Sequence, residues 1–254
     1  MNDRRSDNPL HGNWVSSRLL LVPGVLSAAF IGMSFLRPLL GIAAFVFLLI
    51  FGYFAYARYV FSPRGWNLQN RIQDLVVDHL EWDGIGRAID IGCGSGSLTI
   101  KVALKYSNAE ISGIDNWSGH WEYSAGKCRR NAEIEGVADR TSFQSASASA
   151  IPFEDETFDL AVSNLTFHEV RDTRDKKALL REALRVVKEG GAFVFQDLFL
   201  WKVVYGEIDE LLETVKGWGV RKVAFAATND REFIPGALKL PFMVGTMGIL
   251  YGVK

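Results

Sequence analysis

The sequence predicts an α/β domain whose parallel sheet is covered by helices on both faces, preceded by two apolar helices. The stretch Ala88–Ile100, AIDIGCGSGSLTI, joins an apolar strand to three glycines at every second position and then to an amphipathic segment. A second predicted strand ends at Asp115. Strand, glycine turn, helix and strand make the βαβ unit of parallel sheets. Two long uncharged segments before residue 58 predict the apolar helices.

The uncharged segments predict a membrane hairpin. Residues 19–36 and 39–57 contain no charged side chain. At about 1.5 Å per residue, each helix spans roughly 27–29 Å, close to the hydrocarbon thickness of a bilayer. Arg37 and Pro38 separate the segments, and proline suits the first turn of a new helix. Most flanking arginines lie at the two outer ends, so the positive-inside rule places both ends in the cytoplasm.

Two other interpretations of this region stay open. Small residues at 27–29, Ser-Ala-Ala, have the spacing of a signal-peptide cleavage site. Pro23, Gly24 and Gly32 also permit a hairpin that packs against the domain or re-enters without crossing. The predicted organisation is an N-terminal cytoplasmic segment (1–18), a two-helix membrane hairpin (19–57), a linker (58–66) and a catalytic domain facing the cytoplasm (67–254).

Charge and cysteine content exclude several classes of protein. The formal net charge of −1 over 254 residues predicts no nucleic-acid partner. Residues 1–65 hold six basic and two acidic side chains, a net charge of +4, and the remainder holds 22 basic and 27 acidic ones, a net charge of −5. A basic, apolar end fits contact with anionic lipid head groups. The two cysteines and four scattered histidines predict neither a disulfide framework nor a metal site, which indicates a reducing, cytoplasmic setting.

The glycine spacing distinguishes two kinds of cofactor site. Gly92, Gly94 and Gly96 let the backbone approach a ligand closely. A dinucleotide fingerprint, Gly-x-Gly-x-x-Gly, would need a third glycine where Ser97 or Thr99 stands. The spacing therefore predicts a ligand that has no pyrophosphate to seat on the helix N-terminus. In parallel sheets such ligands bind beyond the carboxyl ends of the strands.

Four stretches, in order, resemble class I S-adenosylmethionine-dependent methyltransferases, most closely the broad type-11 group that includes ubiquinone and menaquinone methyltransferases. They are DIGCGSG (90–96), GID (113–115), IPFEDETFDLAVSNLTFHEV (151–170) and VVKEGGAFVFQDLF (186–199). The resemblance covers about residues 67–200. It implies S-adenosylmethionine as cofactor and a Rossmann-like seven-stranded methyltransferase sheet with helices on both faces. The last two strands of this sheet, antiparallel to each other, are expected within residues 221–228 and 243–254.

The resemblance also implies roles for individual residues. Asp90 would orient the methionine end of the cofactor, and Asp115 would accept hydrogen bonds from both ribose hydroxyls. Trp117 is expected either to pack on the adenine or to be an ordinary core aromatic. The full predicted cofactor-binding set is Asp90, Gly92, Cys93, Gly94, Gly96, Asp115, Asn116, Trp117, Ser147, Ala148 and Asn164.

One position departs from the family pattern. Many relatives carry Gly-Asp-Ala before the "PF" turn, where the acid meets the adenine amino group, and this chain has Ala146-Ser147-Ala148. A serine hydroxyl accepts a hydrogen bond without charge assistance. Backbone carbonyls and Ile151 are then expected to contribute to adenine recognition.

The chemistry that the resemblance implies is methyl transfer, in which the protein aligns the reactants and excludes water. A base is needed only when the acceptor is a hydroxyl or an acidic carbon. The predicted catalytic candidates are His168, Asn164 and Glu169, with Asp197 as a further one. A purely structural role, at the start of a helix, stays open for His168.

Two functional hypotheses follow. The first is a membrane-anchored methyltransferase acting on a small molecule, with a lipophilic acceptor such as a quinone, sterol or other lipid. The second is a non-catalytic, cofactor-binding membrane scaffold. A nicotinamide-dependent oxidoreductase is disfavoured by the glycine spacing. The stretch 235–243, PGALKLPFM, either caps the site, touches the membrane or is a packed connecting loop.

Overall fold

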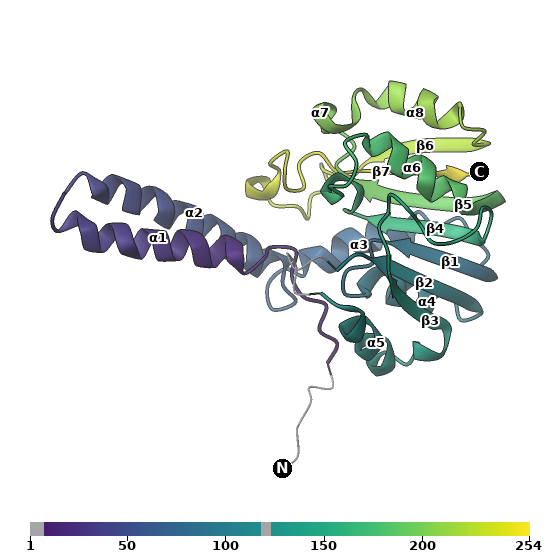
Figure 1. The fold of residues 1–254 in the computed structure, drawn as a ribbon, viewed down its shortest axis with the longest axis horizontal. Coiled ribbons are helices and arrows are strands. Elements are labelled where there is room, and N and C mark those ends of the chain that lie inside the picture. Colours follow the sequence, from purple (N-terminus) through teal and green to yellow (C-terminus); the bar gives the residue numbers. More distant parts are fainter. Residues whose placement is uncertain (1–7, 118–122) are drawn as a thin grey trace, which may run out of the picture. The chain divides into compact units, whose positions relative to one another are not determined.

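The computed structural model describes residues 8–117 and 123–254 (Figure 1). The described chain divides into two compact units. One comprises residues 12–72 and contains the apolar hairpin. The other comprises residues 8–11, 73–117 and 123–254 and contains the sheet.

The hairpin unit is built from α1 (Arg18–Ser34) and α2 (Leu40–Phe61), which pack against each other along their length (Figure 1). The Ser27 hydroxyl donates to the Ala44 carbonyl at 3.0 Å, which removes a polar group from the apolar surroundings. The rings of Phe30 and Phe47 stack with centroids 5.6 Å apart. The two uncharged segments therefore form the predicted helical pair.

Within the described residues, only α2, with 22 residues, is long and apolar enough by length and composition to cross a membrane, and α1 is a shorter apolar helix. The helix continues to Phe61, past the predicted hairpin boundary at residue 57. Arg58 lies in this extra turn, where its guanidinium donates to the Val15 carbonyl and its own carbonyl accepts from the Asn13 side chain at 2.9 Å. These contacts with the segment before α1 extend the helix, so the linker begins at Ser62 rather than at residue 58.

The second unit contains a mixed sheet in the order β3-β2-β1-β4-β5-β7-β6 (Figure 1). The strands are β1 (Gly86–Ile91), β2 (Ala109–Asp115), β3 (Thr141–Ser145), β4 (Phe158–Asn164), β5 (Val187–Asp197), β6 (Lys222–Ala227) and β7 (Gly248–Val253). The first five strands are parallel, and β7 is antiparallel to both β5 and β6. The predicted seven-stranded methyltransferase sheet is confirmed, including its antiparallel last pair.

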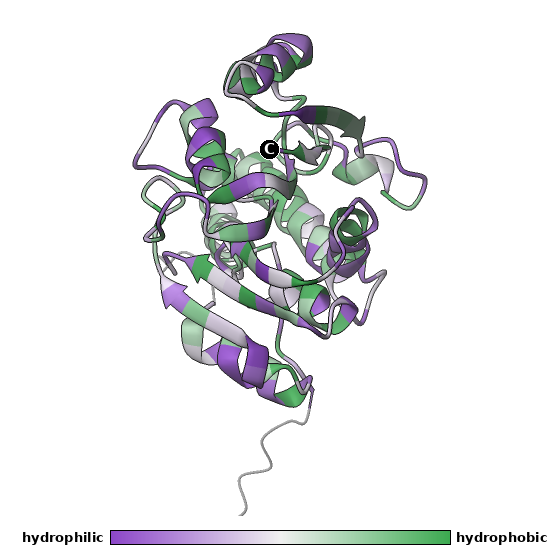
Figure 2. Cartoon of the chain, turned by 90° about the vertical axis from the view of Figure 1, so that its right-hand side faces the viewer, coloured by the Kyte–Doolittle hydropathy of each residue, from purple (hydrophilic) through white to green (hydrophobic). Residues whose placement is uncertain are grey.

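Helices cover both faces of this sheet. They are α3 (Leu68–Asp78), α4 (Ser97–Lys105), α5 (Ala125–Ile134), α6 (Lys176–Arg185), α7 (Lys202–Tyr205) and α8 (Ile208–Lys216). Alternate residues of a strand point to opposite faces, and Ala88 and Ile89 accordingly belong to different hydrophobic clusters. One cluster contains residues of α6 and α8, and the other contains residues of α4 and α5. Figure 2 shows hydrophilic and hydrophobic residues interleaved along these helices, as expected of helices with one buried face.

The parallel strands bring their carboxyl ends to one edge of the sheet. Ile91 pairs with Ile114 on one side and Ser163 on the other, and Asn164 pairs with Gln196. Strands β2, β4 and β5 therefore end at this edge in Asp115, Asn164 and Asp197, with the end of β1 between those of β2 and β4. We call this edge the carboxyl edge. The predicted strand over 243–254 begins only at Gly248, because residues 243–246 form turns instead.

Candidate functional site

The glycine loop follows β1 at the carboxyl edge. The amides of Gly92 and Cys93 both donate to the Ile114 carbonyl, at 2.8 and 3.0 Å, which ties the loop to the end of β2. Gly92, Gly94 and Gly96 have φ angles of +76°, +56° and +79°. This left-handed backbone is strained for other residues, so the turn from strand to helix α4 requires the glycines.

The three glycines do not all leave room for a ligand. A Cβ at Gly92 would collide with the Thr166 side chain, and one at Gly96 would lie 3.1 Å from the Phe143 ring. Among the described residues, a Cβ at Gly94 would meet only ordinary van der Waals neighbours, with the ring of Tyr123 3.5 Å away. The missing side chains at Gly92 and Gly96 therefore make room for Thr166 and Phe143, and Gly94 is the position of the three at which the described residues leave space for a bound molecule.

Asp115 links the glycine loop to the end of β2. One carboxylate oxygen accepts the Gly94 amide at 2.9 Å, and the other accepts the Trp117 amide at 2.7 Å. Burial raises the pKa of this carboxyl above its ordinary value, and the two backbone hydrogen bonds oppose that rise. Each carboxylate oxygen has a further lone pair for a hydroxyl donor. The arrangement fits the role in ribose binding that the resemblance implies for Asp115.

Asp90 lies beneath the same loop and is buried. It accepts a hydrogen bond from the Thr99 hydroxyl at 2.6 Å. Burial raises the pKa of the Asp90 carboxyl to about 7, against the opposing effect of this hydrogen bond. Near neutral pH the group is thus poised between its two forms, and a nearby cation would favour the ionised one.

Trp117 packs within the protein. Its indole N–H donates to the Gly94 carbonyl at 2.8 Å, and its ring lies against the hydrophobic cluster of α4 and α5. These contacts favour the core-aromatic interpretation over stacking on adenine. Asn116 is exposed, and Cys93 is buried. His120, one of the four scattered histidines, lies outside the described residues.

Ser147 makes a contact that the sequence did not predict. Its hydroxyl and that of Ser149 both donate to Asp172 Oδ2, each at 2.6 Å. These two hydrogen bonds hold the pKa of Asp172 below its ordinary value. Asp172, from the segment after β4, thus brings a carboxylate to Ser147, the position at which the family pattern has an acidic residue. Ala148, the next predicted site residue, is buried.

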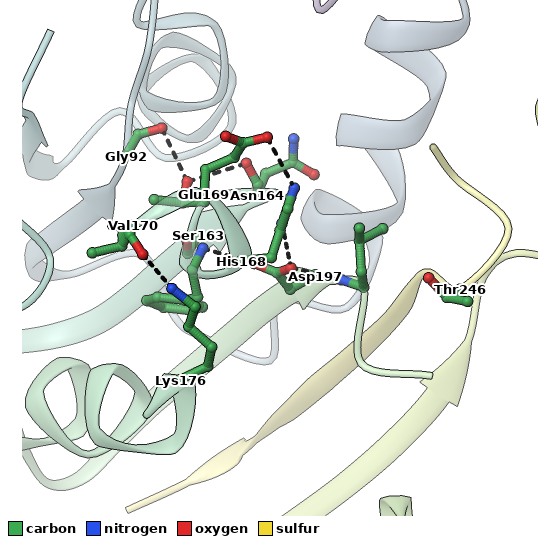
Figure 3. A network of polar contacts seen from close by, with 12 residues as sticks. Gly92, Ser163, Asn164, His168, Glu169, Val170, Lys176, Asp197 and Thr246 are labelled. Atoms are coloured by element: carbon green, nitrogen blue, oxygen red, sulfur yellow. Dashed lines mark hydrogen bonds and ion pairs between the residues drawn. The ribbon is translucent and has the colours of Figure 1, made fainter. Parts of the chain in front are cut away.

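His168 and Asp197 form a pair at the ends of β4 and β5 (Figure 3). The Nδ1 atom of His168 lies 2.6 Å from Asp197 Oδ1, and its Nε2 lies 3.5 Å from Glu169 Oε1. Burial disfavours the imidazolium, but the attraction and hydrogen bond of Asp197 prevail and raise the pKa of His168 to about 10. At neutral pH the ring is therefore protonated and acts as a donor.

Asp197 is fully buried and also accepts backbone amides. Its Oδ2 accepts from Phe167 at 2.7 Å, and its Oδ1 accepts from Leu198 at 2.6 Å. These bonds hold the short 3₁₀ turn Phe167–Glu169 against the end of β5. The pair thus has a structural role whether or not it also acts in catalysis.

Asn164, the last residue of β4, has a buried side-chain oxygen without a hydrogen-bond partner among the described residues. A buried unpaired carbonyl is costly, so this oxygen is a candidate acceptor for a ligand. Thr166 connects the same strand end to the glycine loop, because its hydroxyl lies 3.4 Å from the Gly92 carbonyl. Sequence reasoning missed Thr166, whose separation from Gly92 follows no local pattern.

Comparison with known proteins agrees with this geometry. Residues 89–195 match the family model described as "Methyltransferase domain". Malonyl-acyl carrier protein O-methyltransferase of Geobacter sulfurreducens is 30% identical over 131 residues, covering 50% of this chain and 45% of that protein. Sterol 4-C-methyltransferase strm-1 of Caenorhabditis elegans is 27% identical over 137 residues, 53% of this chain and 38% of that protein. The chain spans less than half the length of these curated relatives.

Solved structures share the fold. Geranyl diphosphate methyltransferase in complex with SAM superposes with a TM-score of 0.55 at 15% identity, over 74% of this chain and 86% of that one. The 4+2 cyclase SpnF gives a TM-score of 0.55 at 20% identity, over 73% and 81%. The second unit of the structure therefore has the fold that these solved structures share. Within it lies the segment 89–195 that matches the methyltransferase domain model.

Proposed function

We propose that the chain is an S-adenosylmethionine-dependent methyltransferase, anchored in a membrane by its hairpin, with its domain on the cytoplasmic side. The observation that carries the proposal is the junction of Asp115 and Gly94 at the carboxyl edge. There a half-buried carboxylate and an open glycine backbone meet within the segment that matches the family model. A carboxylate in this position can accept hydrogen bonds from the ribose hydroxyls of a nucleoside.

The residues present fit the cofactor. Considering only the described part of the chain, Gly94 leaves space, Asp115 has lone pairs not used by the protein, and the Asn164 side-chain oxygen has no partner. Ionised Asp90 favours a cationic amino group close to the loop. When bound, S-adenosylmethionine supplies a methyl group on a positively charged sulfur. The residues of the chain position that group and keep water away from it.

On the acceptor side, we propose that the role of the His168–Asp197 pair depends on whether the His168 ring is protonated. A general base must be neutral to take a proton, and the pKa of about 10 keeps His168 charged at neutral pH. In its charged form the ring stabilises negative charge on an acceptor oxygen, nitrogen or carbon. An acceptor that is already anionic suits this state best.

The membrane part of the proposal is supported by the hairpin and by the charge distribution. Only 11% of the apolar window of α2 is buried, so most of its apolar surface is left for lipid. The basic side chains of residues 1–65 fit anionic head groups. A lipophilic acceptor, such as a quinone, sterol or other lipid, then lies within reach. The names of relatives that methylate a sterol and geranyl diphosphate are compatible with that class.

The test is methyl transfer by the full-length chain in membrane vesicles. Labelled S-adenosylmethionine is supplied, and the label is followed into a lipid extract. The proposal predicts labelled product that depends on the chain and is lost in Asp115→Ala. Binding of the cofactor product S-adenosylhomocysteine without any transfer, across lipid extracts of several sources, would favour the non-catalytic scaffold instead.

A further inference from the structure

The loop between β6 and β7 presents two apolar side chains to solvent. Leu238 and Val244 are buried and fix the loop to the domain. Between them, Leu240 is 37% exposed and Phe242 is 56% exposed. We call residues 240–242, Leu-Pro-Phe, the apolar tip. Apolar side chains that lie together on a surface mark interaction sites, whereas single exposed ones are ordinary, so what surrounds the tip decides between the two.

The apolar tip is held rigidly by its own hydrogen bonds. The Leu240 carbonyl accepts the amides of Met243 and Gly245, at 2.9 and 3.0 Å. The Thr246 hydroxyl donates to the Pro241 carbonyl at 2.7 Å. A Cβ at Gly245 would collide with the Lys239 carbonyl, so glycine is required for this tight turn. The fold thus fixes the exposure of the two side chains.

The tip lies at the carboxyl edge, near the candidate catalytic pair. Gly248 of β7 pairs with Asp197 of β5, and the Leu200 amide donates to the Thr246 carbonyl at 2.9 Å. Helix α7 follows Leu200 and presents Val203, which is 90% exposed. Figure 1 places α7 and the β6–β7 loop at the same end of the sheet.

The charged side chains near the tip are of both signs, so they would neither strongly attract nor strongly repel a charged partner. Lys239 is exposed beside it, and Lys202 is paired with Glu207 at 2.8 Å. Arg231 and Glu232, earlier in the loop, are both exposed and opposite in sign. The surface is therefore suited to apolar insertion with little electrostatic cost, rather than to a highly charged partner.

The same chain supplies a reason to choose a bilayer as the occupant. Helix α2 ends at Phe61, and the domain unit resumes at Gln73. Residues 62–67 separate α2 from α3 (Leu68–Asp78), so the covalent connection between the hairpin and the domain is short. A tether this short raises the effective concentration of the membrane surface at the domain, so a small apolar tip is sufficient to dock.

We propose that the apolar tip and Val203 insert into the interface of the bilayer that holds the hairpin. The carboxyl edge then faces the membrane, and a lipid-dissolved acceptor reaches the His168–Asp197 pair directly from the bilayer. This inference rests on the membrane anchoring in the proposed function and adds to it the route and the chemical class of the acceptor.

Site-directed spin labelling of the full-length chain tests the docking. Cys93 and Cys128 are both buried, so a nitroxide attaches to an added, exposed cysteine, and the unsubstituted chain measures the background. Three single variants are reconstituted into vesicles of phosphatidylcholine and phosphatidylglycerol: Phe242→Cys at the tip, Val46→Cys on the exposed face of α2, and Glu189→Cys at the opposite end of β5. Collision rates with oxygen and with a water-soluble nickel complex report the depth of each label.

The proposal predicts that oxygen outcompetes nickel at positions 242 and 46, and that nickel prevails at 189. Nickel access at 242 equal to that at 189, with 46 in lipid, overturns the docking and leaves the anchoring intact. Nickel access at both 46 and 242 overturns the anchoring and the docking together. Spin–spin broadening at 242 that disappears on dilution with unlabelled chain would assign the tip to a second copy and also overturn the proposal.

Discussion

Gly94→Ala, compared with a matched control, separates the effect of backbone strain on stability from the effect of a blocked site on ligand affinity. At Gly94, with φ of +56°, alanine adopts a left-handed backbone at a cost of about 1–2 kcal/mol in stability. Among residues 8–117 and 123–254, its methyl group meets no side chain closer than the Tyr123 ring at 3.5 Å, so packing adds little to that cost. The methyl group would, however, occupy the space that the proposed function assigns to the cofactor.

The matched control is Gly190→Ala. Gly190 has φ of +78° and no atom within 4 Å of an added Cβ, and it lies in β5 away from the carboxyl edge. Both variants are therefore expected to lose about 1–2 kcal/mol of stability. Only Gly94→Ala is expected to weaken S-adenosylhomocysteine binding, by tenfold or more, which corresponds to about 1.4 kcal/mol.

The measurement is thermal unfolding together with titration calorimetry on the full-length chain in detergent. Gly92→Ala serves as a contrasting variant, because its Cβ collides with Thr166, and overpacking adds about 1–3 kcal/mol to the strain. Equal S-adenosylhomocysteine affinity in Gly94→Ala and Gly190→Ala, with equal stability losses, would refute the assignment of the open space to the cofactor.

Three further predictions concern titration and the serine contact. The pKa of His168 rises from 6.5 to about 10 on folding. The protonated ring therefore contributes fully to the free energy of unfolding below pH 6.5, and this contribution is lost as the pH rises through 10. Asp197→Asn should abolish this dependence of the free energy of unfolding on pH. The pKa of Asp90 rises from 3.8 to about 7, so stability falls as the pH rises through that range. S-adenosylhomocysteine affinity should increase over the same range, and calorimetry of Asp90→Asn should show no such increase. Because Asp172 is exposed and holds the Ser147 hydroxyl, Asp172→Ala should leave the melting temperature nearly unchanged but weaken S-adenosylhomocysteine binding severalfold.

Local pattern was sufficient to predict the elements that position the site. The apolar run before Gly92 and the alternate glycines predict a strand and a turn, and Asp115 follows from the end of the next strand. These features are determined by neighbours in sequence, through side-chain alternation and backbone sterics. The paired apolar helices were predictable for the same reason.

The contacts that complete the site could not be predicted in this way. Thr166 is 74 residues from Gly92, and Asp172 is 25 residues from Ser147. Such pairs meet only because the strand order places their loops at one edge. The late start of β7 likewise depends on the tight turn at Gly245, where backbone hydrogen bonds replace strand pairing.

Calorimetric titration of the full-length chain with S-adenosylhomocysteine, beside Asp115→Ala, tests the central claim most directly. The account predicts micromolar binding that the substitution weakens by tenfold or more, or about 1.4 kcal/mol, because the ribose hydroxyls lose their acceptor. Unchanged affinity in a folded Asp115→Ala variant, or no binding by the folded wild-type chain, would contradict the assignment of this edge to S-adenosylmethionine.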